Sequence, residues 1–127
     1  GTALQRAQII KGFIKNGEHS EVVYDVACSD GLTVDPDTHR CPDNGATVNL
    51  ADCSITAGVG ASELKTLWQD PDFEAGQEAF YYVRVLENPT CRWSTWDAIK
   101  AGVEPRSDLH KTIQERVWSS PIWYKNS

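Results

Sequence analysis

The dipeptide Asn16-Gly17 constrains the fold of this chain more than any other feature, because it separates two runs with strong β propensity. AQIIKGFIK (7–15) precedes it and EHSEVVYDVAC (18–28) follows it without further spacing. A two-residue type I′ turn needs positive φ at both central positions, and Asn-Gly meets that need. The pattern therefore predicts an antiparallel hairpin over residues 7–28.

Three later runs predict further strands. AFYYVRVLE (79–87) has apolar residues on both of its faces, which is typical of a central strand covered on each side. Arg84 is the exception, and we expect its side chain to be hydrogen-bonded because an unpaired buried charge is costly. SELKTLWQD (62–70) and RVWSSPIWY (116–124) predict the other two strands. Because Pro121 cannot donate to a ladder, the last strand should lie at a sheet edge or carry a bulge.

One short helix is expected near residues 95–101. Ser94 or Thr95 is the expected N-cap, and Gly102 is the expected stop signal. Residues 107–115 are expected to hold one further helical turn. All 127 residues fit a single domain. Strands dominate this pattern, so it predicts a mainly β fold: a β-sandwich-like antiparallel domain with a short helix.

A long irregular loop is predicted between residues 29 and 60, where Asp, Gly, Pro, Asn and Thr dominate. Loops of this length are uncommon in compact domains unless they are functional or tied down. The four cysteines show no CxxC pair and no standard zinc spacing, so we expect disulfides and an oxidising compartment. Three connectivities stay open, with a preference for Cys41–Cys53 inside the loop and Cys28–Cys91 between strand ends.

Charge and hydropathy argue against two classes of partner. The net charge is −6 and the basic residues are scattered, so the basic patch that drives nucleic-acid binding is missing. No apolar segment approaches the ~20 residues that span a bilayer. The first residues lack the layout of a signal peptide. We expect a periplasmic or secreted protein whose signal, if any, lies upstream of this chain.

Asp35, Asp37 and Asp43 are the candidates for a calcium site, because their alternate spacing resembles that of a calcium-binding loop. The match fails at His39, which takes the third ligand place, and at the places where glycine and a bidentate glutamate belong. A solvated loop held by disulfides is therefore the preferred interpretation. Ser119 lacks the turn that exposes a nucleophile. We expect no catalytic residue and no cofactor site in this chain.

The tryptophans make the best case for binding. Arg92, Trp93 and Trp96 are neighbours in the sequence and could stack on a sugar or a partner chain. Trp123 is a further candidate, because alternation along the last strand puts it on the face opposite Trp118. The preferred interpretation is that the large aromatic side chains stabilise a core, with Trp118 as its anchor.

AFYYVRVLENPTCRWSTWDA and IQERVWSSPIWY resemble the C-terminal end of the bacterial proteins grouped as the domain-of-unknown-function 3604 family. LQRAQIIKGF, VYDVACSDG and TLWQDPDFEAGQEAFYYVRV fit the same pattern, so the resemblance covers essentially the whole chain. Members are several times longer, often exported, and similar to PHP-type (polymerase and histidinol phosphatase) metal-dependent hydrolases. The residues that match the family's closing motif, with a structural role implied, are Tyr82, Arg84, Trp118, Ser119, Pro121 and Ile122.

The resemblance implies a function for the chain as part of a longer protein. The catalytic barrel of such proteins holds a divalent metal through His, Asp and Glu, but this chain contains no His-x-His pair, so no ligand carries over. We therefore expect a non-catalytic C-terminal β-domain that packs against an upstream catalytic domain or against a copy of itself. The alternative is a carbohydrate- or protein-binding module that uses exposed Trp and Arg side chains.

Overall fold

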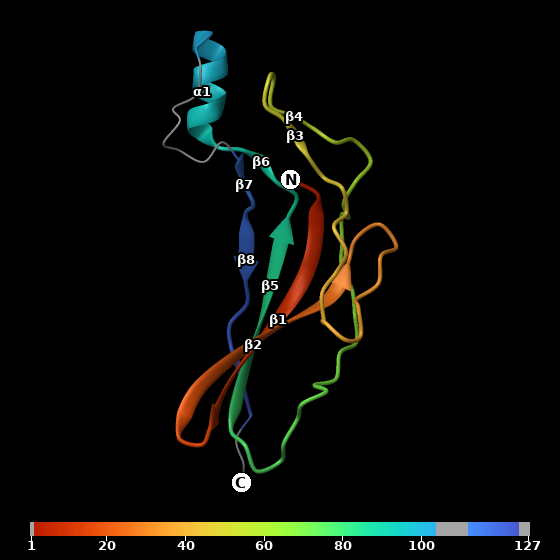
Figure 1. Cartoon of the computed structure of the whole chain (residues 1–127), viewed down its shortest axis with the longest axis vertical. Coiled ribbons are helices and arrows are strands. Elements are labelled where there is room, and N and C mark those ends of the chain that lie inside the picture. The colour runs from red at the N-terminus through yellow and green to blue at the C-terminus, as the bar shows by residue number, and fades with distance from the viewer. Residues whose placement is uncertain (1, 104–111, 125–127) are drawn as a thin grey trace.

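The computed structural model describes residues 2–103 and 112–124, an elongated and mainly antiparallel β domain (Figure 1). Its main sheet has the order β2-β1-β5-β8, and β9 also pairs with β5. The strands of this sheet are β1 (Leu4–Lys15), β2 (Glu18–Cys28), β5 (Ala79–Glu87), β8 (Arg116–Trp118) and β9 (Ile122–Tyr124). The mainly β class and the central position of the strand at 79–87 are confirmed.

The hairpin of β1 and β2 forms as the sequence predicts. Asn16 and Gly17 both have positive φ, 52° and 78°, and Lys15 pairs with Glu18 on either side of the turn. Val26 of β2 forms a bulge: Ala7 and Gln8 of β1 pair with Ala27 and Asp25, and Val26 between these two has no partner on β1. The bulge adds local twist, and the hairpin extends beyond the rest of the sheet (Figure 1).

Four two-residue strands and one helix complete the described elements. The small strands β3 (Val48–Asn49) and β4 (Ser54–Ile55) pair with each other, as do β6 (Thr90–Cys91) and β7 (Thr112–Ile113). Helix α1 (Trp93–Ala101) begins two residues before the expected start. Its N-cap is Arg92, rather than Ser94 or Thr95 as expected. Gly102 ends it in the left-handed conformation, φ 70°, as predicted.

Two sequence predictions of local structure are not met as stated. Residues 62–70 form no strand: Trp68 and Asp70 contact the main sheet, whereas most of the run is exposed, Leu67 fully so. Tertiary packing overrides the β propensity of that run: Trp68 packs on Tyr24 and Tyr81, and the backbone of the run pairs with no strand. In the predicted helical turn at 107–115, residues 107–111 lie outside the described part, and Thr112 and Ile113 form β7.

All four cysteines form disulfides, but the preferred connectivity is wrong. Cys28 bonds Cys41 and Cys53 bonds Cys91. The chain folds back after β2, where the Asp25 amide donates to the His39 carbonyl at 2.9 Å, and this return brings Cys41 beside Cys28. The two disulfides therefore tie the long loop to β2 of the main sheet and to β6, and they indicate an oxidising environment.

The main sheet has one covered face and one open face. Cross-strand partners share a face, so Lys11, Tyr24 and Tyr81 lie on the covered face, under residues 68–75. Gln8 and Arg84 lie on the open face. The arrangement is β-sandwich-like, with the long loop running along one side as the second layer (Figure 1). The expectation that 79–87 is covered on both sides is met on the open face at Leu86, which is buried, but not at Phe80, Tyr82 and Arg84, which are only half-buried there.

In the described ranges, no helix has both the length and the apolar character needed to cross a membrane.

Candidate functional site

A row of polar side chains crosses the open face from β2 to β8. Gln8 donates from Nε2 to Oδ1 of Asp25 at 2.7 Å, and Arg84 donates from Nε to Oε1 of Gln8 at 2.7 Å. The guanidinium of Arg84 also lies over the ring of Trp118, 5.1 Å from its centroid. Register explains the row, because these four residues are successive cross-strand partners. The expectation that Arg84 is hydrogen-bonded is confirmed.

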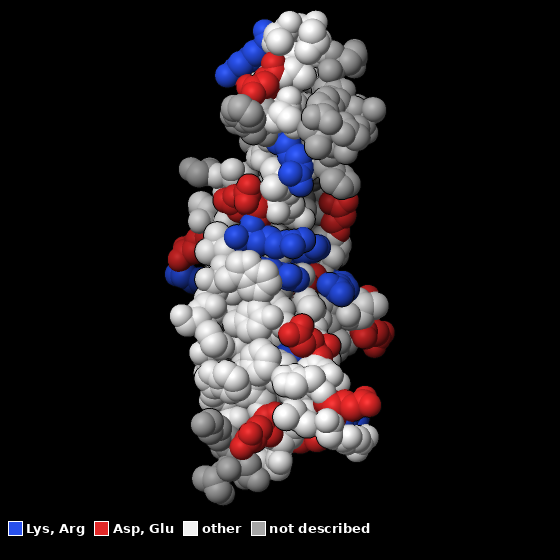
Figure 2. All heavy atoms as spheres, turned by 90° about the vertical axis from the view of Figure 1, so that its left-hand side faces the viewer, with Lys and Arg blue, Asp and Glu red and all other residues white. Residues whose placement is uncertain are grey.

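Positive charge gathers around this row. Arg6 and Arg116 are both cross-strand partners of Leu86, one from β1 and one from β8. Burial, followed by the nearby charge of Arg116, lowers the pKa of the Arg84 guanidinium. Figure 2 views the side of the molecule on which β8 lies and shows a band of basic side chains across its middle.

Next to the arginines, four aromatic side chains form a continuous row on the open face. Ring centroids are 5.1 Å apart for Trp123 and Phe80, 6.0 Å for Phe80 and Tyr82, and 5.3 Å for Tyr82 and Trp118. The Phe80 ring covers Gly12, its cross-strand partner, so closely that a Cβ there would collide with it. We call Phe80, Tyr82, Trp118 and Trp123 the aromatic row. Figure 2 shows a mostly uncharged surface beside the basic band.

Both indoles of the aromatic row are exposed, whereas Phe80 and Tyr82 are half-buried, and this corrects the role predicted for Trp118. Trp118 is 50 % exposed and Trp123 is 64 % exposed, so Trp118 is no core anchor. Alternation along 116–124 predicts that these two side chains lie on opposite faces, but the chain leaves the ladder between β8 and β9. Two strand segments separated at residues 119–121 place both indoles on the open face.

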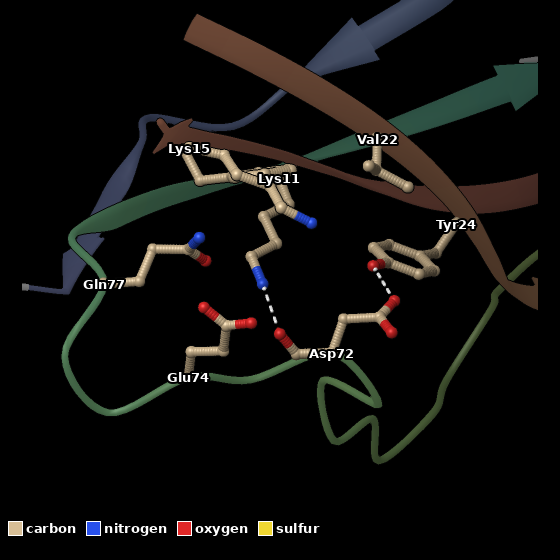
Figure 3. A pocket seen from close by; sticks show the side chains of 8 residues that line it. Lys11, Lys15, Val22, Tyr24, Asp72, Glu74 and Gln77 are labelled. Carbon is tan, nitrogen blue, oxygen red and sulfur yellow. Dashed lines mark hydrogen bonds between the residues drawn. The ribbon is translucent and has the colours of Figure 1, made fainter. Parts of the chain in front are cut away.

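A second polar cluster is buried on the covered face. The Lys11 ammonium lies 2.7 Å from Oδ2 of Asp70 and donates to the Asp72 carbonyl at 3.0 Å. Tyr81 donates to Oδ2 of Asp70 at 2.7 Å, and Tyr24 donates to Oδ2 of Asp72 at 2.6 Å. Figure 3 shows Lys11 and Tyr24 reaching from the sheet toward the loop that carries Asp72. The cluster therefore fastens residues 70–72 to the sheet.

The electrostatics of this cluster follow from burial and pairing. Burial and the hydrogen bonds to Asp72 and Asp70 raise the pKa of the Tyr24 and Tyr81 hydroxyls, respectively. Burial alone would raise the pKa of Asp70, but hydrogen bonds from Lys11 and Tyr81 outweigh it and lower that pKa. The cavity beside the cluster measures about 190 Å³, and Lys15, Glu74 and Gln77 also line it. Because Lys11 and Asp70 pair with each other, we assign this cluster a structural role.

The residues of the closing motif come together, and their contacts hold the last strands on β5. Ser119 donates its amide to the Val83 carbonyl and accepts the Val83 amide on its side chain, both at 2.9 Å. Ile122 pairs with Tyr81 in the register of β9. Pro121 lies in the interruption between β8 and β9, as expected for a proline at a sheet edge or bulge.

The candidate binding residues do not form one site. Trp96 lies on α1, which follows the far end of β5, whereas Trp123 pairs with Phe80 at the near end. Trp96 is exposed, and Arg92 is the N-cap of α1. Trp93 begins α1, but its side chain lies outside the described part.

The calcium candidates act within their own turns. Asp35 accepts the amides of Asp37 and Thr38 on Oδ1, at 2.8 and 3.1 Å, and these bonds lower its pKa. Asp43 accepts the Gly45 amide at 2.9 Å. In residues 2–103 and 112–124 no group of three His, Cys, Asp or Glu side chains is placed to hold a metal ion. The carboxylates of Asp35 and Asp43 are used within their own turns, so the described residues offer no built site for a divalent metal.

Four important residues escaped the sequence analysis: Gln8, Lys11, Asp25 and Asp70. A usable signal was present for three of them. Gln8, Lys11 and Asp25 interrupt apolar runs in strands that are otherwise typical of a core, and buried polar groups need partners. Asp70 had no such signal, because it belongs to a segment whose placement depends on the tertiary fold.

One of three comparisons with known proteins supports the family named from the sequence. No curated protein and no solved structure matches the chain. Residues 1–126 match the family described as "Protein of unknown function (DUF3604)". Because that match spans nearly all of its 127 residues, the chain belongs to the DUF3604 family.

Proposed function

We propose that this chain is the non-catalytic C-terminal β-domain of a longer, periplasmic or secreted protein related to PHP-type metal-dependent hydrolases. Its function is to dock through the open face of the main sheet onto the catalytic domain of the same protein. The divalent metal and the catalytic ligands belong to that upstream domain. The observation that carries the proposal is the aromatic row, which no described segment of the chain covers.

A row of large aromatic side chains whose two indoles are exposed is typical of an interaction surface. Aromatic and arginine side chains are also the residues most enriched at the centres of protein interfaces. The row and the adjacent arginines lie on one continuous face, which supports a single docking surface. The exposed fractions of Trp118 and Trp123, 50 % and 64 %, leave much apolar area for a partner to bury.

The edges of the main sheet support docking by the face and argue against strand addition. On the β2 edge the Asp25 amide is already bonded to the His39 carbonyl, and Glu18 and Glu21 near the hairpin add charge. On the opposite edge, β8 and β9 are three residues each and are separated by the Pro121 interruption. Short, charged or interrupted edges resist pairing with another chain.

The test uses the full-length protein with a protease site inserted directly upstream of residue 1. After cleavage we expect the two pieces to co-elute in gel filtration at low micromolar concentration. Replacing the two exposed indoles, Trp118→Ser and Trp123→Ser, should separate them. A matched control is Trp96→Ser, because Trp96 is also exposed but lies on α1. Pieces that separate without any substitution would contradict the proposal.

The alternative, a carbohydrate-binding module, is favoured by the same exposed aromatic row. Sugar rings stack on flat indole and phenol surfaces. That function requires the row to stay accessible in the full-length protein. Acrylamide quenching of tryptophan fluorescence in the full-length protein separates the two, because a docked face shields Trp118 and Trp123 and a glycan-binding face does not.

A further inference from the structure

The open face carries more positive charge than its own carboxylates balance. Arg6, Arg84 and Arg116 surround Leu86 in the register of β1, β5 and β8. Asp25 is the only carboxylate of the described residues within 4.0 Å of these arginines or of Arg40, and it contacts Arg6 and Arg40 at 3.9 Å. Such a surplus stands out in a chain whose net charge is −6.

Asp25 does not neutralise these arginines, because both of its carboxylate oxygens already accept hydrogen bonds from other groups. Its side chain is completely buried, Oδ1 accepts from Gln8 at 2.7 Å, and Oδ2 accepts from the Cys41 amide at 2.7 Å. The two arginine contacts at 3.9 Å are longer than hydrogen bonds. Asp25 is therefore a support for the row of polar side chains rather than a neutralising partner for the arginines.

The arginines retain unused donors. Arg6 Nε is buried without a hydrogen-bond partner among the described residues. Arg116 is exposed, and its guanidinium forms no hydrogen bond or ion pair with any described residue. The only side-chain hydrogen bond that Arg84 makes within the described residues uses Nε, so its two terminal nitrogens remain available. Stacking on Trp118 and the bond to Gln8 hold this guanidinium in place before any partner arrives.

We infer that Arg84 and Arg116 bind the carboxylate of an acidic side chain on the polypeptide that covers the open face. The inference rests on the proposed docking function and names the chemistry of its partner. A guanidinium fork matches a carboxylate with two parallel hydrogen bonds, and a preorganised arginine loses little freedom in forming them. The aromatic row beside it supplies the apolar part of the same interface.

The geometry of the aromatic row favours a polypeptide over an acidic glycan. Stacking of successive sugar rings needs side chains that share one plane. Here Phe80 and Tyr82 are nearly parallel, at 7°, but Trp123 is tilted 47° from Phe80 and Trp118 is tilted 39° from Tyr82, so the four rings do not share one plane. The surface is uneven, and irregular side-chain packing fills such a surface better than a flat saccharide does.

The experiment measures the affinity of the two cleaved pieces of the full-length protein. Arg116→Gln removes an exposed side chain, so it should leave the melting temperature unchanged while weakening the complex about tenfold or more. Arg84→Lys keeps the charge but loses the fork, and it should weaken the complex by about as much. The matched control is Lys65→Gln, which removes one positive charge from an exposed lysine of the loop and should change affinity less than about twofold.

The outcomes separate the two proposals. If the pieces bind and none of the arginine variants changes their affinity, the carboxylate contact is wrong and docking stands. If the wild-type pieces do not bind, docking fails and the inference fails with it. A third arm offers polygalacturonate to the intact protein. Binding of that probe, abolished by Arg116→Gln, would show an open glycan-binding face and overturn the inference.

Discussion

Lys11 and Asp70 form a buried ion pair, 2.7 Å between Nζ and Oδ2, with side chains only 2 % and 7 % exposed. The pair joins the middle of β1 to a segment with no strand of its own. Two tyrosines flank it and hydrogen-bond the same short segment. A loop that would otherwise lie free on the surface is thereby fixed over the covered face of the sheet.

Breaking this pair should destabilise the domain strongly. Lys11→Met leaves Asp70 buried without its counter-charge, and such changes cost about 3–5 kcal/mol. The double variant Lys11→Met, Asp70→Leu should recover much of that loss, because it removes both buried charges. Lys65→Met is the control, since its pair with Glu63 is exposed and should be worth about 1 kcal/mol or less. Urea denaturation measures all three, and equal losses for Lys11→Met and Lys65→Met would contradict the structure.

Asp70 should also make stability depend on acid pH. Its pKa is lowered in the folded state, so its contribution is fully present above the unfolded value of about 3.9 and is lost as pH falls through the lower folded value. The stability difference between wild type and Asp70→Asn should therefore shrink below about pH 4. Melting temperatures between neutral and strongly acidic pH check this. A difference that stays constant over that range would exclude a titrating Asp70.

The two disulfides should contribute unequally to stability. Their sequence separations are 13 residues for Cys28–Cys41 and 38 for Cys53–Cys91. Loop-closure entropy then predicts losses of about 3 and about 4 kcal/mol for the respective double Cys→Ala variants. Non-reducing peptide mapping provides the direct check of connectivity. A linked Cys41–Cys53 peptide would contradict the fold of the long loop.

Trp118→Ala should cost far less than truncation of a buried aromatic side chain. Trp118 is half exposed and contacts Arg84 and Tyr82, so we expect a loss of about 1 kcal/mol. Tyr24→Ala is the comparison, because Tyr24 is 1 % exposed and core truncations of this size cost about 3–5 kcal/mol. Similar losses of unfolding free energy for both variants in chemical denaturation would show that Trp118 is buried in the core.

Gly12 and Phe80 should be energetically coupled. Gly12→Ala places a methyl group against the Phe80 ring, and such overpacking costs about 1–3 kcal/mol. In a Phe80→Ala background the same substitution should cost much less. Gly76→Ala serves as the control, because a Cβ there meets no atom within 4 Å. Additive losses in the double-mutant cycle would show that the ring does not cover Gly12 in solution.

The sequence predicted those elements whose signals are local. Asn16-Gly17 specifies its turn through φ alone, and Gly102 ends its helix in the same way. The strand at 79–87 was recognisable from composition. The run at 62–70 was misassigned because a strand also needs a neighbour with free hydrogen bonds, and no local pattern reveals whether one is present.

The candidate site was harder to predict because it depends on register and on what covers each face. Trp118 and Trp123 share a face only because the ladder is interrupted between them, which alternation cannot anticipate. Arg84 was rightly expected to have a partner, but the identity of Gln8 follows from the pairing of β1 with β5. The disulfide connectivity failed for a related reason, since the path of the long loop decides it.

The connectivity of the disulfides has a consequence for biogenesis. Each bond joins cysteines that are neighbours in order of appearance, first Cys28 with Cys41 and then Cys53 with Cys91. A chain oxidised as it emerges, N-terminus first, would meet each correct partner before any later thiol competes for it. Among the four cysteines of this chain, native pairing would then form without rearrangement by a disulfide isomerase. In the pairing expected from the sequence, Cys28 with Cys91 and Cys41 with Cys53, the Cys28 thiol would have to stay reduced while Cys41 and Cys53 emerged.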